Sequence, residues 1–181
     1  TPERPQTYYG SSKLKADKEL VAMNDREFKA AIIRPPMAYG GGMAPGNMLR
    51  LIRLVNKHIP LPFGSARNSR DFINVKNLVE FIHLAVEKEV EGVFYPTDKV
   101  PYSTRNVVEE ISRQLGVHTI NLPSPSIFLK LIEKVRPDLY QKLWGDVVID
   151  RQLALSAIGY EPRYTLEDGI REMVESFKRQ K

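Results

Sequence analysis

The chain has 181 residues, 42% of them hydrophobic, which suffices to bury one core or one domain and part of another. Cysteine is absent, which excludes disulfides and thiolate metal sites and favours a reducing, cytoplasmic location. The formal net charge is +5, but the 27 basic residues are spread among 22 acidic ones rather than gathered in one tract, so we expect no nucleic-acid binding.

Two further classes of protein are disfavoured by the sequence. The histidines His58, His83 and His118 lie far apart without the spacing of metal ligands, so we expect no metal centre. No apolar run approaches the roughly 18 to 20 residues that a membrane-spanning helix needs, and residues 1–5 do not resemble a signal peptide. We therefore expect no membrane association.

Helical and strand-like segments alternate along the chain, which predicts an α/β fold. A helix is expected from Ser11 or Ser12 to residue 24, followed by a strand at 28–34. The apolar centre of that strand, residues 30–33, is typical of a parallel sheet covered on both faces. Prolines end the strand at 35–36. Residues 37–46 contain three consecutive glycines and predict a loop where backbone can approach a ligand closely.

The remaining elements follow from periodicity and capping signals. Helices are predicted at 47–57, 76–89 and 126–134, and Pro137 is expected to interrupt any continuation of the last one toward Trp144. Strand-like pieces are predicted at 61–63, 92–96 and 120–122, and a strand or loop at 70–75. Ser103 or Thr104 is expected to cap a helix that ends at Gly116. A cap-like stretch at 165–168 predicts a terminal helix with apolar residues at Ile170, Met173, Val174 and Phe177.

Tyr9 and Lys13 form a Tyr-x-x-x-Lys pair near the start of the chain. At positions i and i+4 of a helix both side chains lie on one face, so the ammonium can stand beside the phenol. A fixed positive charge favours the phenolate and lowers the tyrosine pKa from its usual value near 10, which makes a general acid/base. In a chain with eight tyrosines the spacing alone is a weak signal.

Four segments in fixed order give this pair a context: residues 9–17, 33–40, 69–78 and 158–162. In that order and spacing the chain resembles the extended short-chain dehydrogenases/reductases of the NAD-dependent epimerase/dehydratase family. Within the family it resembles the UDP-hexose 4-epimerase branch. The similarity extends over essentially the whole chain.

The resemblance implies the C-terminal part of an NAD(P)-binding Rossmann-like fold with a smaller substrate-binding α/β domain. Residues 1–42 would be the tail of the Rossmann-like domain, and 43–181 mainly the substrate-binding domain, with about 71–98 returning to the Rossmann-like sheet. No Gly-x-x-Gly-x-x-Gly turn precedes Tyr9, nor does a catalytic serine or threonine. We therefore expect a fragment that is inactive alone and does not bind NAD normally.

On the cofactor side, the resemblance implies three roles. Tyr9 matches the catalytic tyrosine, and Lys13 matches the lysine that hydrogen-bonds the nicotinamide ribose and lowers the tyrosine pKa. Pro36 matches a position that contacts the NAD cofactor.

On the substrate side, the resemblance implies a UDP-sugar site. Asn47 matches a residue that touches the diphosphate, with a simple helix cap as the alternative. Leu61 and Phe63 match a short strand whose backbone faces the uracil, with ordinary packing as the alternative. Arg70 matches an arginine that pairs with the diphosphate, which suits a planar guanidinium, with a surface salt bridge as the alternative.

Three residues depart from the family pattern. Met37 stands where UDP-galactose epimerases have asparagine, which puts a polar contact to the substrate there in question. Asp17 replaces the usual glutamate of the tyrosine helix. Lys76 stands where an acidic residue is common.

The implied activity of the full-length parent is NAD-dependent epimerisation at C4 of a UDP-hexose or UDP-N-acetylhexosamine, in a homodimer. A sugar-nucleotide 4,6-dehydratase or a 4-keto reductase of the same superfamily is the alternative enzyme. A non-catalytic sugar-nucleotide-binding or dimerising module is the alternative outside enzymes.

Overall fold

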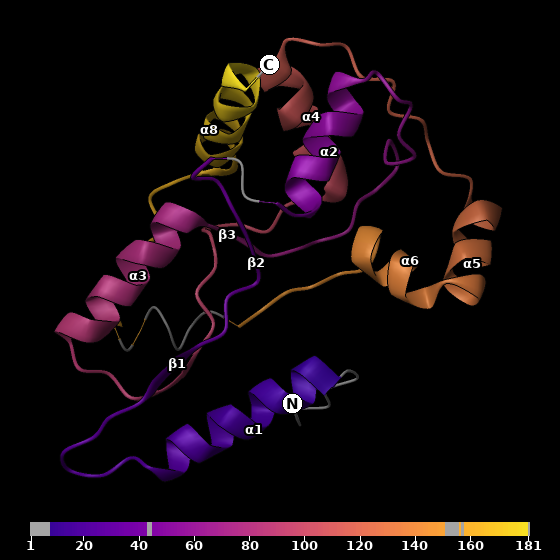
Figure 1. Cartoon of the computed structure of the whole chain (residues 1–181). Coiled ribbons are helices and arrows are strands. Elements are labelled where there is room, and N and C mark those ends of the chain that lie inside the picture. Colours follow the sequence, from indigo (N-terminus) through magenta and orange to yellow (C-terminus); the bar gives the residue numbers. More distant parts are fainter. Residues whose placement is uncertain (1–7, 43–44, 151–155, 157, 181) are drawn as a thin grey trace.

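The computed structural model describes residues 8–42, 45–150, 156 and 158–180. Its elements follow one another as helices and short strands (Figure 1). They are α1 (Tyr8–Ala22), β1 (Ala31–Ile33), β2 (Met37–Tyr39), α2 (Asn47–Asn56), β3 (Phe72–Asn74), α3 (Val75–Glu87), β4 (Gly92–Phe94), α4 (Thr104–Leu115), α5 (Ser126–Val135), α6 (Pro137–Leu143) and α8 (Leu166–Arg179).

Two parallel strand pairs form the β structure of the described residues. β1 pairs with β4, with Ile32 opposite Val93, and β2 pairs with β3, with Ala38 opposite Ile73. The predicted strand at 28–34 is therefore confirmed as a parallel strand. Its predicted coverage on both faces holds only in part: Ile32 is buried and Ile33 partly buried, while Ala31 is exposed to solvent. Ile33, on the same face as Ala31, packs against the small core of α3 and β4.

Several predicted boundaries need correction. Residues 37–39 form β2 instead of the start of a loop, because pairing with a distant strand outweighs the local turn signal. The loop is therefore shorter, and its residues 43–44 lie outside the described residues. Helix α1 begins at Tyr8 rather than at Ser11 or Ser12. Pro137 separates α5 from α6 as expected and occupies the first turn of α6, where a missing N–H costs nothing.

The main hydrophobic core lies among α2, α4 and α8, which gather in one part of the molecule (Figure 1). Ile52, Val108 and Ile170 are fully buried there. Capping boxes at Ser103 and Thr165 start α4 and α8, and Gly116 ends α4 with a left-handed φ of 70°. These signals explain why both helices were predictable from sequence.

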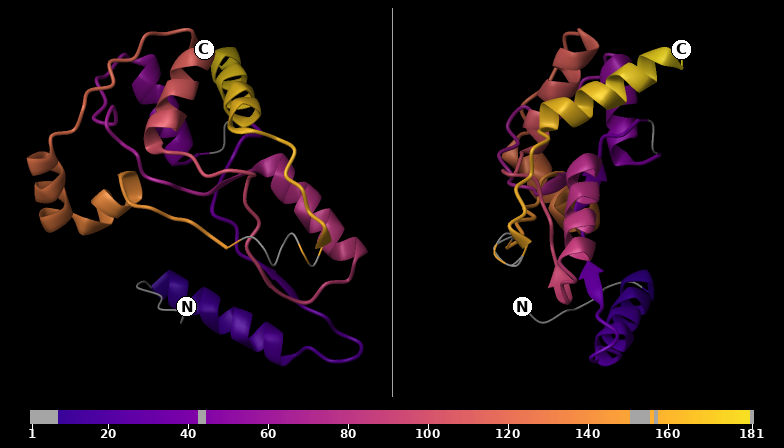
Figure 2. Two further views of the ribbon diagram at one scale, coloured as in Figure 1. Left: turned by 180° about the vertical axis from the view of Figure 1, so that it is seen from behind. Right: turned by 90° about the vertical axis from the view of Figure 1, so that its left-hand side faces the viewer.

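A second, smaller core packs α3 against β4. Phe81 and Phe94 lie with ring centroids 5.9 Å apart, and Tyr160 meets Phe81 edge-on at 5.1 Å. Helix α1 has no buried residue and lies apart from α2, α4 and α8 in all three views (Figures 1 and 2). An ion pair between Asp17 and Arg34, 2.7 Å long, connects it to the end of β1.

The buried carboxylate of Asp98, which follows β4, holds the ends of several elements together. It accepts hydrogen bonds from the Tyr39 hydroxyl at 2.6 Å, the Asn74 backbone N–H at 2.9 Å and the Asn77 side-chain amide at 2.7 Å. Asn77 in turn accepts from the backbone N–H groups of Arg163 and Tyr164. β2, β3, α3 and the segment before α8 are thus joined at one point.

Desolvation raises the pKa of the Asp98 carboxyl above its usual value, and the three hydrogen bonds oppose that rise. A raised pKa in the folded state means that the carboxyl contributes most to stability below pH 3.8. This contribution is lost as pH rises through the folded-state pKa.

We predict that Asp98→Asn lowers the free energy of unfolding by about 1–3 kcal/mol near pH 4, because a buried donor loses its acceptor. The deficit should shrink toward pH 7, where the wild-type carboxylate carries the cost of buried charge. Urea unfolding at pH 4 and at pH 7 measures this difference in the free energy of unfolding.

Glu91→Gln, at an exposed site, is the control, and its free energy of unfolding should stay within about 0.5 kcal/mol of wild type at both pH values. A deficit that grows with pH would contradict the account.

Candidate functional site

An open cavity of about 560 Å³ lies between α2, the segment 61–63, Arg70 and α6. Four of the residues singled out in the sequence line it, namely Asn47, Leu61, Phe63 and Arg70. They come from separate segments, and the core of α2 and α4 brings them together. Met37, the departure from the family pattern, also lines this cavity. Its thioether makes this part of the wall apolar.

The cavity wall is apolar with a positive rim. Among the described residues, Arg50, Arg70 and Lys142 are the charged ones that line it, and none of the lining residues is acidic. Most other lining side chains are aliphatic or aromatic, including Leu51, Leu54 and Phe72. Apolar walls with a few placed cations suit a ligand that combines a flat ring with an anionic group.

Asn47 is the first residue of α2 and is exposed to solvent. The N-cap is Gly46, with φ 166°, and no side-chain cap bond is formed there. The alternative role of Asn47 as a helix cap is therefore wrong. Its amide lies at a helix N-terminus, where unpaired backbone N–H groups and the helix dipole favour anions.

Arg70 is half-buried, and its guanidinium contacts the end of α6. Nη1 donates to the carbonyl oxygens of Gln141 at 2.8 Å and Gly145 at 2.7 Å. Desolvation lowers the pKa of Arg70, and the charge of Asp146 opposes this. Arg70 forms no ion pair within the described ranges, so it is not the surface salt bridge considered as an alternative. A guanidinium has five N–H donors, and both contacts use one nitrogen, so others can face a ligand.

Leu61 and Phe63 are both buried and form the inner wall. The Leu61 N–H donates to Ile120 O at 3.0 Å, and its carbonyl accepts from Leu122 N. The Phe63 N–H donates to the Asn121 side chain at 3.1 Å. These N–H groups already hold residues 120–122, which form a single bridge rather than the predicted strand. The side chains of Leu61 and Phe63 therefore form this part of the cavity wall. The Phe63 ring packs on Trp144, with their ring centroids 5.3 Å apart.

The residues expected on the cofactor side do not join this cavity. Tyr9 is 74% exposed in the first turn of α1, and the Lys13 ammonium lies 5.7 Å from its ring centroid. Pro36 is half-buried between β1 and β2. The pair thus shares one helix face as predicted, while neither residue lines the cavity. Their catalytic and cofactor roles stay predictions.

Sequence reasoning missed two lining residues, Arg50 and Lys142. Arg50 lies three positions after Asn47 on α2, so helical spacing could have placed both on one face. Lys142 reaches the cavity only through the turn at Pro137 and the packing of α6, and no local signal reveals it. Within the described part of the chain, no three potential ligand side chains gather as a metal site. No described helix is long and apolar enough to cross a membrane.

Comparison with known proteins identifies the family. The sequence model described as "NAD dependent epimerase/dehydratase family" matches residues 1–95, so the chain belongs to that family. A UDP-glucose 4-epimerase of Vibrio cholerae is 35% identical over 179 residues, which cover 96% of this chain and 54% of that protein. The chain thus spans about half the length of this relative.

Solved structures confirm the predicted fold class. A UDP-glucuronic acid 4-epimerase from Bacillus cereus, in complex with NAD, matches with TM-score 0.75 and 19% identity over 98% of this chain and 54% of that one. A dTDP-glucose 4,6-dehydratase from Bacillus anthracis, also in complex with NAD, matches with TM-score 0.74 and 19% identity. This match covers 100% of this chain and 55% of that one. The chain therefore has the α/β fold of about half of a Rossmann-like epimerase/dehydratase. Both of these structures are complexes with NAD, which supports NAD as the cofactor of the family.

We predict that Arg70→Lys lowers the free energy of unfolding by about 1–2 kcal/mol, because an ammonium cannot satisfy both α6 carbonyls with the same planar geometry. Arg67→Lys, at an exposed arginine nearby in sequence, is the matched control and should change it by less than about 0.5 kcal/mol. Urea unfolding of the three proteins measures both effects. Equal stability of the two variants would show that the Arg70 contacts to α6 are weak.

Proposed function

We propose that the chain forms the sugar-nucleotide side of an NAD-dependent nucleotide-sugar 4-epimerase acting on a UDP-hexose or UDP-N-acetylhexosamine. The observation that carries this proposal is the convergence of Asn47, Leu61, Phe63 and Arg70 on one cavity. The epimerase relative from Vibrio cholerae supports the same reaction class. The activity belongs to a protein that also carries the family's nucleotide-binding half.

The cavity accounts for recognition of UDP in physical terms. The uracil would lie against the apolar wall at Leu61 and Phe63. The diphosphate would lie toward Arg70, Arg50 and the N-terminus of α2 at Asn47. Charge-assisted hydrogen bonds from a guanidinium to phosphate are among the strongest polar contacts that proteins make.

The Tyr9–Lys13 pair would supply the acid/base step. Tyr9 would accept the proton of the hexose O4 and return it after the 4-keto sugar has turned, and Lys13 would hold the nicotinamide ribose and favour the phenolate. Bound NAD would supply the reversible hydride transfer at C4. Pro36 would contact the cofactor. The chain has no Gly-x-x-Gly-x-x-Gly turn to hold the NAD pyrophosphate, so we propose that these 181 residues alone are inactive.

A 4,6-dehydratase is the second candidate, because the dehydratase from Bacillus anthracis matches the fold over the whole chain. A 4-keto reductase and a non-catalytic binding module remain the further alternatives. We also propose a homodimer formed through α1, supported by the exposed apolar side chains of Leu20, Val21 and Met23. The cytoplasmic location and the domain boundary at residues 42/43 stay predictions.

We predict that UDP binds the 181-residue protein at least about tenfold more tightly than uridine does, because the phosphates meet the cationic rim. Arg50→Gln should lower UDP affinity about three- to tenfold and leave uridine affinity unchanged. Arg53→Gln, on the same helix but away from the cavity, is the matched control and should bind like wild type. Calorimetric titration of the three proteins measures these affinities.

Equal affinity for UDP and uridine, or no UDP binding, would overturn the proposed site. NAD titrated into the same protein tests the second half of the proposal. Tight NAD binding would contradict the view that the cofactor site is incomplete in these residues.

A further inference from the structure

One edge of strand β1 has no neighbouring strand within the described part of the chain, because β1 and β4 form a sheet of only two strands. The carbonyl of Ala30 accepts a hydrogen bond from β4 at 3.0 Å, and the N–H of Arg34 donates one to β4 at 2.9 Å. Alternate residues of a strand direct their backbone groups to opposite edges. The N–H and C=O groups of Ala31 and Ile33 therefore point away from β4. Such an edge is a template for a further strand.

An open groove of about 570 Å³ lies along this edge, between β1 and α3. Ala31 and Ile33 line it from β1, and Ile82 and Val86 line it from α3. None of the residues Gly92–Phe94 of β4 lines the groove, which places it on the unpaired side of β1. An added strand can therefore hydrogen-bond to β1 and pack against α3 at the same time.

The side of α3 next to the groove is apolar. Val79, Ile82 and Val86 recur at helical spacing and are 59%, 41% and 71% exposed. The rim of the groove is polar, and two of its residues, Lys29 and Glu89, form an ion pair 3.4 Å long. An apolar centre with a polar rim is typical of a surface that binds another protein segment.

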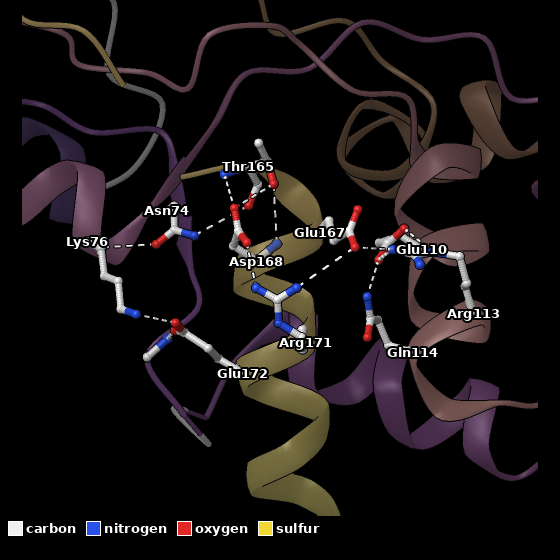
Figure 3. A network of polar contacts seen from close by, with 11 residues as sticks. Asn74, Lys76, Glu110, Arg113, Gln114, Thr165, Glu167, Asp168, Arg171 and Glu172 are labelled. Carbon is white, nitrogen blue, oxygen red and sulfur yellow. Dashed lines mark hydrogen bonds and ion pairs between the residues drawn. The ribbon is translucent and has the colours of Figure 1, made fainter. Parts of the chain in front are cut away.

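The exposed sides of α4 and α8 have a different character. Arg113 of α4 pairs with Glu167 of α8 at 2.9 Å, and Arg171 pairs with Asp168 at 2.6 Å (Figure 3). Paired charges of this kind are typical of a face that stays in contact with water. The apolar stripe on α3 is therefore not a general property of the helix surfaces in this chain.

The missing neighbour of β1 should be a parallel strand. Both strand pairs of the described residues are parallel, and α1 leads into β1 as the helix of a strand–helix–strand unit leads into its second strand. The relatives contain material for it, because the chain covers only 54% of the Vibrio cholerae epimerase. The remainder of that protein includes the half that the family resemblance assigns to nucleotide binding.

We propose that the groove between β1 and α3 is the docking surface for a parallel β-strand of the family's nucleotide-binding half, and that this half binds the 181-residue protein even as a separate polypeptide. The added strand pairs with the backbone of Ala31 and Ile33 and covers the apolar stripe on α3. This docking surface is separate from the proposed sugar-nucleotide cavity, with which it shares no lining residue.

The test is co-expression of the tagged 181-residue protein with the part of the Vibrio cholerae epimerase that it does not match. The two polypeptides should purify as a complex with one copy of each. Amide hydrogen exchange at Ala31 and Ile33 should be at least about tenfold slower in the complex than in the 181-residue protein alone, because their N–H groups become bonded. This exchange locates the contact at the open edge of β1.

Two substitutions with matched controls test the groove itself. Ala31→Pro removes an N–H that points to the partner and keeps the bonds to β4, and it should retain at least about tenfold less of the partner half. Val93→Pro is its control, because Val93 directs its N–H to the outer edge of β4. Val86→Lys, at a site too exposed to affect folding, should also lose the partner, whereas Ile127→Lys, 81% exposed on α5, should retain it.

Failure of the wild-type protein to retain the partner half would overturn the proposal. Unchanged exchange at Ala31 and Ile33 in the complex, or full retention by both Ala31→Pro and Val86→Lys, would overturn it as well. Dimers of the 181-residue protein alone that Ala31→Pro abolishes would assign the groove to a second copy instead. UDP titration without the partner half tests the sugar-nucleotide cavity independently, so failure of the proposed function and failure of this docking surface are distinguishable.

Discussion

The buried carboxylate of Asp98 fixes the ends of β2, β3 and α3 relative to one another. A carboxylate removed from water is costly unless donors surround it, and three donors from Tyr39, Asn74 and Asn77 do so here. These residues lie at the end of β2, the end of β3 and the first turn of α3. Because all three must reach one carboxylate, the ends of these elements have little freedom relative to one another.

The same network also reaches the residues next to these ends. Tyr39 is the last residue of β2 and is followed by Gly40. Asn74 caps α3, and Asn77 holds the residues before α8. Gly169 lets the first turn of α8 pass close to the Tyr39 ring, where a Cβ would lie 2.4 Å from the ring. This polar network therefore holds β2, β3, α3 and the start of α8 together, while the cavity walls are held by the main core and by the contacts of Arg70 with α6.

Sequence predicted those parts of the molecule that carry local signals. The caps at Ser103 and Thr165 and the apolar periodicity predicted α4 and α8, and the family resemblance pointed to the four residues that share the cavity. Strand β2 could not be predicted, since its formation depends on pairing with residues 72–74 across a sequence distance that no local pattern reports. The role of Asp98 was equally hidden, because nothing around it in sequence shows that three donors converge there. The backbone contacts of Arg70 with α6 likewise arise only from tertiary packing.

The central claim is that the cavity between α2, residues 61–63 and α6 is a site for the uridine diphosphate portion of a sugar nucleotide. A crystal structure of the 181-residue protein with UDP tests it most directly. The account predicts the uracil against Leu61 and Phe63 and the diphosphate within hydrogen-bond distance of Arg70 and Asn47. UDP bound elsewhere on the molecule, or bound in the cavity with its phosphates turned away from Arg70, would contradict it.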